Sequence, residues 1–496
     1  MYQFTAHRFS TLTEQISSSL LALAAVIGFA ASGPAIAAGY SPDPGFNGGQ
    51  YFADAFASDS NLPSHMYSGQ RVAQAANGDL IVAAMVDEAA QQYADQHQAI
   101  GLMRYNRAGV RVAWSNPYLS ATRYYNQYLF LPRHSIGSID DIKVIDDKIV
   151  VLWTDQIIGE LPEASIGWVT VFDDGGRMLS SEPLYSGEGS AEGVHGAALV
   201  LYHQVTSTYA AVVGTYTRDQ RPYYRRFQIA GTGALTLVDD VPLATSACWN
   251  PVWQCQATGL AMSQDTTGAP PRLYVSYAYR SYTGDDLDVV VSRIDAHGVG
   301  DPTWDPNNVH WNLSDGGSRD DWPVGIAVRK TGAGTSTSPY RDEIFVATRS
   351  ARTCRDGIGM IKFNHDGGAV RGLITGGSTS LPSCRIGSSN ADLASTLLID
   401  QDRLIVGGRR ASYRRGQRPL IDAEVASFGF DLTPIALQTL PYPIGLPRQR
   451  DSEFIGATRS DTGGVALVGA LTFLPEAGPT LVGKQQVGTL RVRYLP

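Results

Sequence analysis

Acidic residues stand at the beginnings of several short segments that are expected to be β-strands. They recur along the chain at Asp140, Asp141, Glu192, Asp320, Asp321, Asp392, Asp451 and Glu453. Two converging carboxylates can act as general acid and base, or can hold Ca²⁺. His195 occupies a similar place, and an imidazole titrates near neutral pH. The catalytic candidates are therefore Asp141, Asp321, Asp392, Glu453 and His195.

These acids also have a structural interpretation. A carboxylate that recurs once per repeat can accept hydrogen bonds from a neighbouring backbone or pair with an arginine, and polar groups near a core are usually satisfied in this way. The two interpretations differ in geometry. Catalysis requires the acids and His195 to lie within about 3–6 Å of one another in an open pocket.

Arginine and tyrosine gather in several segments that are expected to be loops. Only five of the 39 basic residues are Lys. Arg presents a planar donor fork that suits carboxylate, phosphate or sulfate, and Tyr stacks on sugar faces. Such loops suit an anionic saccharide or a protein partner, and a solvated charged surface is the alternative. The candidate ligand-binding residues are Arg218, Tyr223, Arg280, Tyr282, Arg352, Arg355, Arg409, Arg414 and Arg415.

The four cysteines and the absence of known motifs limit the chemistry further. Cys248, Cys255, Cys354 and Cys384 form no paired zinc spacing. Pairing 248 with 255 and 354 with 384 is the local solution among three possible ones. The sequence holds no Gly-x-Ser-x-Gly elbow, no His-Glu-x-x-His motif and no phosphate-binding loop. We therefore expect no metal and no cofactor.

Charge and the first residues indicate an exported protein that binds no nucleic acid. The net charge of −8 argues against a basic nucleic-acid surface. Residues 1–37 resemble an export signal, with an apolar run from Leu20 to Ala31 and the small-x-small pattern Ala35-Ile36-Ala37. A retained anchor is the alternative. We expect a periplasmic or secreted protein with no membrane span after signal removal, in a compartment where disulfides form.

A repeated unit organises the rest of the chain. Its second strand is a β-branched apolar run of the kind that is buried on both faces. This run recurs at 79–84, 148–153, 209–214, 272–277, 343–348, 403–408 and 465–470. A third strand repeats in step, and glycine turns at 109, 175, 298 and 367 follow it. These units predict an all-β fold, a seven-bladed β-propeller of four-stranded blades over residues 40–496.

The two ends of the chain are expected to complete one another. The seventh unit lacks a fourth strand, and a spare strand lies at residues 50–54. We expect this N-terminal strand to complete the last blade, which would close the ring and remove an open sheet edge.

Two turns and one strand resemble a known repeat. The turns Asp43-Pro44-Gly45-Phe46 and Asp301-Pro302-Thr303-Trp304, with the strand Leu102-Met103-Arg104-Tyr105, resemble the bacterial delta-60 repeat family. The resemblance covers nearly the whole mature chain and is strongest in the first and fifth units. It implies an exported propeller and carries no catalytic residues.

The two faces of such a propeller are decorated unequally. Short Gly, Asn and Asp turns dominate one face, while the Arg/Tyr segments and all four cysteines belong to the other. Loops carry function more often than scaffolds do. We therefore expect an exported, non-catalytic binding protein that recognises an anionic saccharide or a protein partner. The alternative is a polysaccharide-active hydrolase or lyase with acidic residues at the mouth of the central channel.

Overall fold

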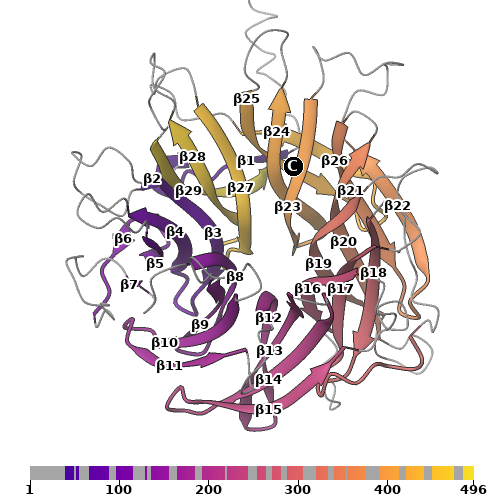
Figure 1. Ribbon diagram of the computed structural model, residues 1–496. Coiled ribbons are helices and arrows are strands. Elements are labelled where there is room, and N and C mark those ends of the chain that lie inside the picture. Colours follow the sequence, from indigo (N-terminus) through magenta and orange to yellow (C-terminus); the bar gives the residue numbers. More distant parts are fainter. Residues whose placement is uncertain are drawn as a thin grey trace, which may run out of the picture. The chain divides into compact units, whose positions relative to one another are not determined.

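The protein is built almost entirely of β-strands, as predicted (Figure 1). The computed structural model describes residues 39–49, 52–54, 66–88, 97–115, 129–130, 136–155, 165–184, 193–217, 220–243, 254–263, 271–280, 287–304, 320–332, 334, 340–352, 355–375, 390–412, 420–440, 450–473 and 484–495. Within these residues the only helical element is the short 3-10 turn η1 (Asn47–Gly49). No helix in the described part is long and apolar enough to cross a membrane.

The strands of the compact unit Tyr40–Arg493 form five hydrogen-bonded sheets. The described chain opens with β1 (Gly39–Pro42). One sheet joins strands from both ends of the chain: β1, β2 (Phe52–Asp54), β3 (Met66–Gln74), β4 (Leu80–Glu88), β5 (His97–Tyr105), β6 (Arg111–Val112), β7 (Leu129–Phe130), β27 (Arg450–Arg459), β28 (Val465–Phe473) and β29 (Lys484–Leu495).

The remaining sheets follow the chain in order. The second contains β8 (Ile136–Ile145), β9 (Lys148–Asp155), β10 (Ile166–Asp173), β11 (Met178–Pro183), β12 (Val194–Gln204), β13 (Ser207–Tyr216), β14 (Pro222–Ile229) and β15 (Leu235–Pro242). The third contains β16 (Gln254–Met262), β17 (Leu273–Arg280) and β18 (Leu287–Ile294). The fourth contains β19 (Asp321–Thr331), β20 (Arg341–Arg352), β21 (Arg355–Phe363) and β22 (Ala369–Thr375). The fifth contains β23 (Asn390–Asp400), β24 (Arg403–Ser412), β25 (Leu420–Phe428) and β26 (Pro434–Thr439).

Each of the two largest sheets consists of two antiparallel sets. A single parallel pair joins the sets, Gln485 with Met66 in one sheet and Ile166 with Val194 in the other. The antiparallel sets therefore begin with β3, β8, β12, β16, β19, β23 and β27. Each of these first strands packs against the first strand of the next set, and β27 packs against β3.

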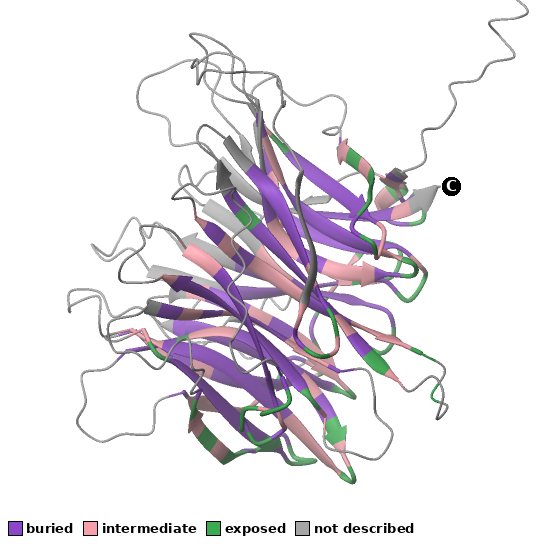
Figure 2. Cartoon of the chain, turned by 90° about the vertical axis from the view of Figure 1, so that its right-hand side faces the viewer, coloured by how far each residue is buried: buried purple, intermediate pink, exposed green. Residues whose placement is uncertain are grey.

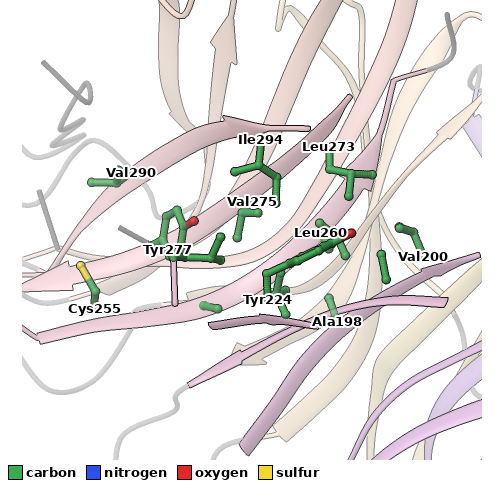
Figure 3. Packing of buried hydrophobic residues seen from close by; sticks show 14 of the residues in the cluster. Ala198, Val200, Tyr224, Cys255, Leu260, Leu273, Val275, Tyr277, Val290 and Ile294 are labelled. Atoms are coloured by element: carbon green, nitrogen blue, oxygen red, sulfur yellow. The ribbon is translucent and has the colours of Figure 1, made fainter. Parts of the chain in front are cut away.

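The second strand of every set is buried, as its sequence predicts (Figure 2). Residues 80–84, 149–153 and 344–347 lie almost wholly out of solvent. Neighbouring sets pack face to face through these strands. Figure 3 shows one such layer, where Val275 and Tyr277 of β17 lie in one cluster with Ala198 of β12 and Tyr224 of β14. Burial of these side chains is the main favourable term that holds one set against the next.

Every first strand carries a β-bulge at an equivalent position. The register shifts between residues 69 and 71, 139 and 141, 196 and 198, 257 and 259, 323 and 325, 394 and 396, and 454 and 456. A bulge bends its strand and turns the following side chains to the other face. Opposite three of the bulges, a Cβ added at Gly214, Gly408 or Gly469 would collide with a first-strand carbonyl oxygen, so only glycine is accommodated there.

The strands have two unlike ends. We call the end where first strands pass to second strands, and third to fourth, the hairpin end. The end where second strands pass to third strands is the crossover end. At the hairpin end, third-strand cations reach the backbone of the following set: Arg104 Nη1 donates to Asp174 O at 2.9 Å, Arg293 Nη1 to His365 O at 2.8 Å, and Lys362 Nζ to Phe430 O at 3.0 Å.

The N-terminal turn is fixed to the C-terminal strand at the hairpin end. Strand β2 pairs antiparallel with β29, from Phe52 opposite Thr489 onward. The fully buried carboxylate of Asp43 accepts from Arg491 Nε, and the Arg491 guanidinium lies 5.1 Å from the centre of the Phe46 ring. The turn at Asp301 repeats this arrangement with Arg293 and Trp304. The aspartate and the aromatic residue of each turn thus hold one buried arginine.

Candidate functional site

The crossover end of β12–β18 brings the exposed Arg221 and the partly exposed Arg280 to either side of one strand. Gln220, between β13 and β14, accepts a hydrogen bond from Cys255 N at 3.2 Å through its backbone carbonyl. Its side-chain oxygen accepts from Gln256 Nε2 at 3.1 Å. These bonds place the segment that carries Arg221 against the start of β16. Arg280, at the end of β17, pairs in register with Gln254, the first residue of β16.

Both arginines present their guanidinium groups at this end. The exposed Arg221 lies over the ring of Tyr216, 5.8 Å from its centre. Tyr216 in turn contacts the ring of Tyr223 at 5.2 Å. The Arg280 side chain is 43% exposed, and its Nη2 lies 3.8 Å from Asp320 Oδ1, a long and solvent-screened ion pair. The arrangement can donate charge-assisted hydrogen bonds to an anion.

The nine predicted ligand residues divide into three groups. Arg280 and Arg409 are partly exposed, and Arg409 Nη1 donates to Glu453 at 2.7 Å. Tyr223 is fully buried, and its hydroxyl donates to His195 O at 3.3 Å, so it has no exposed ring for stacking on a sugar. The others lie outside the described residues or outside the described side chains: Arg218, Tyr282, Arg352, Arg355, Arg414 and Arg415.

Most of the described acids are engaged structurally. Asp141 Oδ1 accepts from Ile142 N and from Lys143 Nζ, and its Oδ2 accepts from Leu199 N of β12 at 3.0 Å. Glu453 binds Arg409 across two sets. These carboxylates cap a backbone and pair with an arginine, which is the structural alternative stated above. They are not left converging in the way that acid–base catalysis needs.

The other two acidic candidates differ in how far the structure describes them. Asp321 is fully buried at the start of β19. Asp392 lies opposite Arg410 in the register of β23 and β24, and its side chain is outside the described part. Among the described residues, no group of three or more His, Cys, Asp or Glu could hold a metal ion.

His195 is placed at the crossover end, where β12 begins. Its Nε2 lies 3.0 Å from Ser165 Oγ, and Ser165 is buried. The histidine keeps an exposed face, and partial burial lowers its pKa below the ordinary value of 6.5. A neutral imidazole beside a hydroxyl can accept a proton from it. Among the described residues, His195 forms no hydrogen bond or ion pair with a carboxylate that would orient its ring.

Asp140 is the acid that the sequence argument did not choose. It is buried in the bulge of β8, where Ser138 Oγ donates to Oδ1 at 2.5 Å and Thr154 Oγ1 donates to Oδ2 at 2.7 Å. Burial raises the pKa of this carboxyl from 3.8 to about 7. The pair Asp140-Asp141 was visible in the sequence. The bulge that separates their environments was not, because no local residue pattern fixes where the register shifts.

The cysteines are mostly outside the described residues. Cys255 is buried in β16, and no cysteine in the described part is free. Cys248, Cys354 and Cys384 fall outside it, as does the segment 1–37 that was interpreted as an export signal. The pairing of the cysteines therefore remains a prediction.

Comparison with known proteins gives distant likenesses. No family model and no curated protein matches the chain. Among solved structures, it is similar to the Dos1 propeller at 10% identity over 91% of this chain and 95% of that one, with a TM-score of 0.43. It is also similar to a protein of unknown function from Dyadobacter fermentans (9% identity, 92% and 100% of the two chains, TM-score 0.42). A third is the GH93 alpha-L-arabinofuranosidase of Fusarium graminearum (13% identity, 76% and 97%, TM-score 0.37). Because these identities and TM-scores are low, the candidate site is described from the contacts of this chain alone.

Proposed function

We propose that the protein is a non-catalytic binding protein that recognises an anionic saccharide through its crossover end. The observation that carries the proposal is the pair of arginines, Arg221 and Arg280, which flank the start of β16 with exposed side chains. The engagement of Asp141 and Glu453 with the backbone and with Arg409 supports binding rather than turnover. Tyr216 adds a ring beside Arg221 on which a sugar can stack.

The proposal includes the architecture that presents this surface. We infer a seven-bladed β-propeller, exported by residues 1–37, with repeats of the delta-60 type and a ring closed by β2. The chain of contacts among first strands, with β27 against β3, supports it. So does the pairing of β2 with β29. The local cysteine pairs 248–255 and 354–384 would brace loops of the same face.

The test is a binding screen with sulfated and carboxylated oligosaccharides, each beside its neutral counterpart. We expect binding to anionic sugars only, weakening as salt rises because the contacts are partly exposed. Arg221→Gln and Arg280→Gln should each weaken binding about tenfold, the value of one charge-assisted hydrogen bond.

The matched control is Arg177→Gln. Arg177 is similarly exposed but lies at the hairpin end, beside Asp173. Its loss should leave the affinity unchanged. If all three substitutions weaken binding equally, the effect comes from the loss of one positive charge on the protein and not from the proposed surface. Unchanged binding in the Arg221 and Arg280 variants would reject the proposed surface, and binding of an acidic protein alone would change the class of ligand.

A further inference from the structure

The buried carboxyl of Asp140 connects three strands from two sets. It sits in the bulge of β8 and accepts from Thr154 Oγ1 of β9. The same Thr154 oxygen accepts from Gly196 N of β12 at 3.1 Å. The backbone of β12 is therefore tied to the Asp140 carboxyl through one hydroxyl. A Cβ on Gly196 would stand 2.6 Å from Asp140 Oδ2, so the strands approach closely at this point.

The partners of this carboxyl are hydroxyl groups, which stabilise a carboxylate but bring no positive charge to offset its burial. In the described part of the chain, the groups bonded to its two oxygens are the hydroxyls of Ser138 and Thr154. A hydroxyl can accept a hydrogen bond from a neutral acid, and it can donate one to a carboxylate. A buried carboxylate without a bonded cation is costly.

The charged and titratable groups around Asp140 relieve only part of that cost. Arg71 of β3 is the nearby cation, but its Nε donates to the Asp140 carbonyl oxygen at 2.7 Å and its Nη1 to Gln70 O at 2.9 Å. Asp141 on the same strand opposes ionisation, and Lys143 is bound to Asp141.

The groups that face Asp140 from β12 and β14 add no positive charge. The neutral hydroxyl of Tyr223, on β14, donates to the backbone of β12. Burial lowers the pKa of His195 on β12, which favours the neutral imidazole.

We propose that Asp140 is a proton-sensitive lock between neighbouring sets. In the protonated state, the carboxyl, Thr154 and Gly196 hold β8 and β9 against β12. When the carboxyl loses its proton, the buried charge draws Arg71 away from the two carbonyls that it binds. Both the β8–β12 junction and the β3–β8 junction then loosen. The protein thus has a tighter form below neutral pH and a looser form above it.

The sign follows from proton linkage. The pKa of Asp140 is about 7 in the folded protein, against 3.8 as its ordinary value. Between these values the folded state holds a proton that the open state releases, so opening becomes easier as the pH rises and levels off above about 7. Burial and the hydroxyl cluster therefore place the transition near neutral pH.

Hydrogen exchange of the full chain tests the lock at the Gly196 amide. After correction for the intrinsic exchange rate, the opening constant of the peptide covering residues 193–199 should rise about tenfold per pH unit from pH 5 to 7, then become constant. Asp140→Asn, which fixes a neutral side chain, should abolish this rise. Asp147→Asn removes an exposed carboxyl of the β8–β9 hairpin and should keep the wild-type profile.

Two outcomes overturn the proposal: a wild-type profile without pH dependence in this range, or an equal dependence in Asp140→Asn. If Asp140→Asn does not fold, Thr154→Val provides the test. It removes a hydroxyl that stabilises the carboxylate, so the midpoint of the profile should move to higher pH. An unmoved midpoint would then reject the lock.

Discussion

Buried, ion-paired arginines distinguish the hairpin end, whereas the crossover end presents exposed arginines and a buried carboxyl whose pKa is raised to about 7. Arg491 with Asp43 and Arg293 with Asp301 are buried ion pairs between turns and strands. The crossover half of the same strands holds Arg221, Arg280, His195 and Asp140. The two ends therefore differ in role. The hairpin end fixes the arrangement of the strands, and the crossover end keeps polar groups available to ligands and protons.

The largest expected effect comes from breaking a pair at the hairpin end. Arg491→Ala leaves the buried Asp43 carboxylate with the half-exposed Arg493 and the Gly45 amide as partners, and removing one member of a buried pair typically costs about 3–5 kcal/mol. Urea unfolding measures the loss. Arg107→Ala removes the exposed partner of Asp461 at the same end and should cost about 1 kcal/mol or less. Equal losses in the two variants would refute the idea that burial distinguishes this pair.

A gain in stability is expected at one hairpin tip. Val205 is 96% exposed and has a φ of 57°, a left-handed conformation that a β-branched residue adopts at a cost. Asp146 and Gln401 occupy the same place in other hairpins, each with a φ of 52°. Val205→Asn should therefore stabilise the protein by about 1 kcal/mol, measured as a higher urea midpoint.

The control for this substitution is Val238→Asn. Val238 lies in strand β15 and is 44% exposed, so the same change there relieves no backbone strain. It should be neutral or slightly destabilising. A loss of stability in Val205→Asn would show that the exposed valine has a compensating contact.

The smallest effect is expected from an ion pair at the crossover end. Arg409 and Glu453 are about one third and one quarter exposed, and a screened pair of this kind contributes under about 1 kcal/mol. Arg409→Ala should lower the urea midpoint only slightly, and less so in high salt. A loss as large as that of Arg491→Ala would remove the contrast between the two ends.

The second strands could be predicted from the sequence because burial on both faces requires a continuous run of apolar residues. The second strands and the pairing of residues 52–54 with the last strand are confirmed. The candidate site was harder to predict, because one extra residue in a strand reverses which of its side chains face the neighbouring set. Asp140 and Asp141 are adjacent, yet one lies buried among hydroxyls and the other caps β12.

The buried arginines were missed for a different reason. Arg104, Arg293 and Arg491 stand within strands whose pattern predicts burial, and that apolar pattern does not identify the partner of an arginine. The usable signal was the aspartate of the Asp-Pro turn. Asp301 follows Arg293 by eight residues, at the distance that a hairpin brings back onto its own strand.

The contact of Asp43 with Arg491 also sets an order of events during synthesis. Asp43 and Tyr40 are made early, but their partners Arg491 and Asp400 come 448 and 360 residues later. Until then, the first turn has neither its guanidinium nor its carboxylate partner, and contacts between such distant residues form slowly. A nascent chain interrupted before Arg491 therefore leaves Asp43 unpaired, and proteases that cut unfolded segments can distinguish it from the finished molecule.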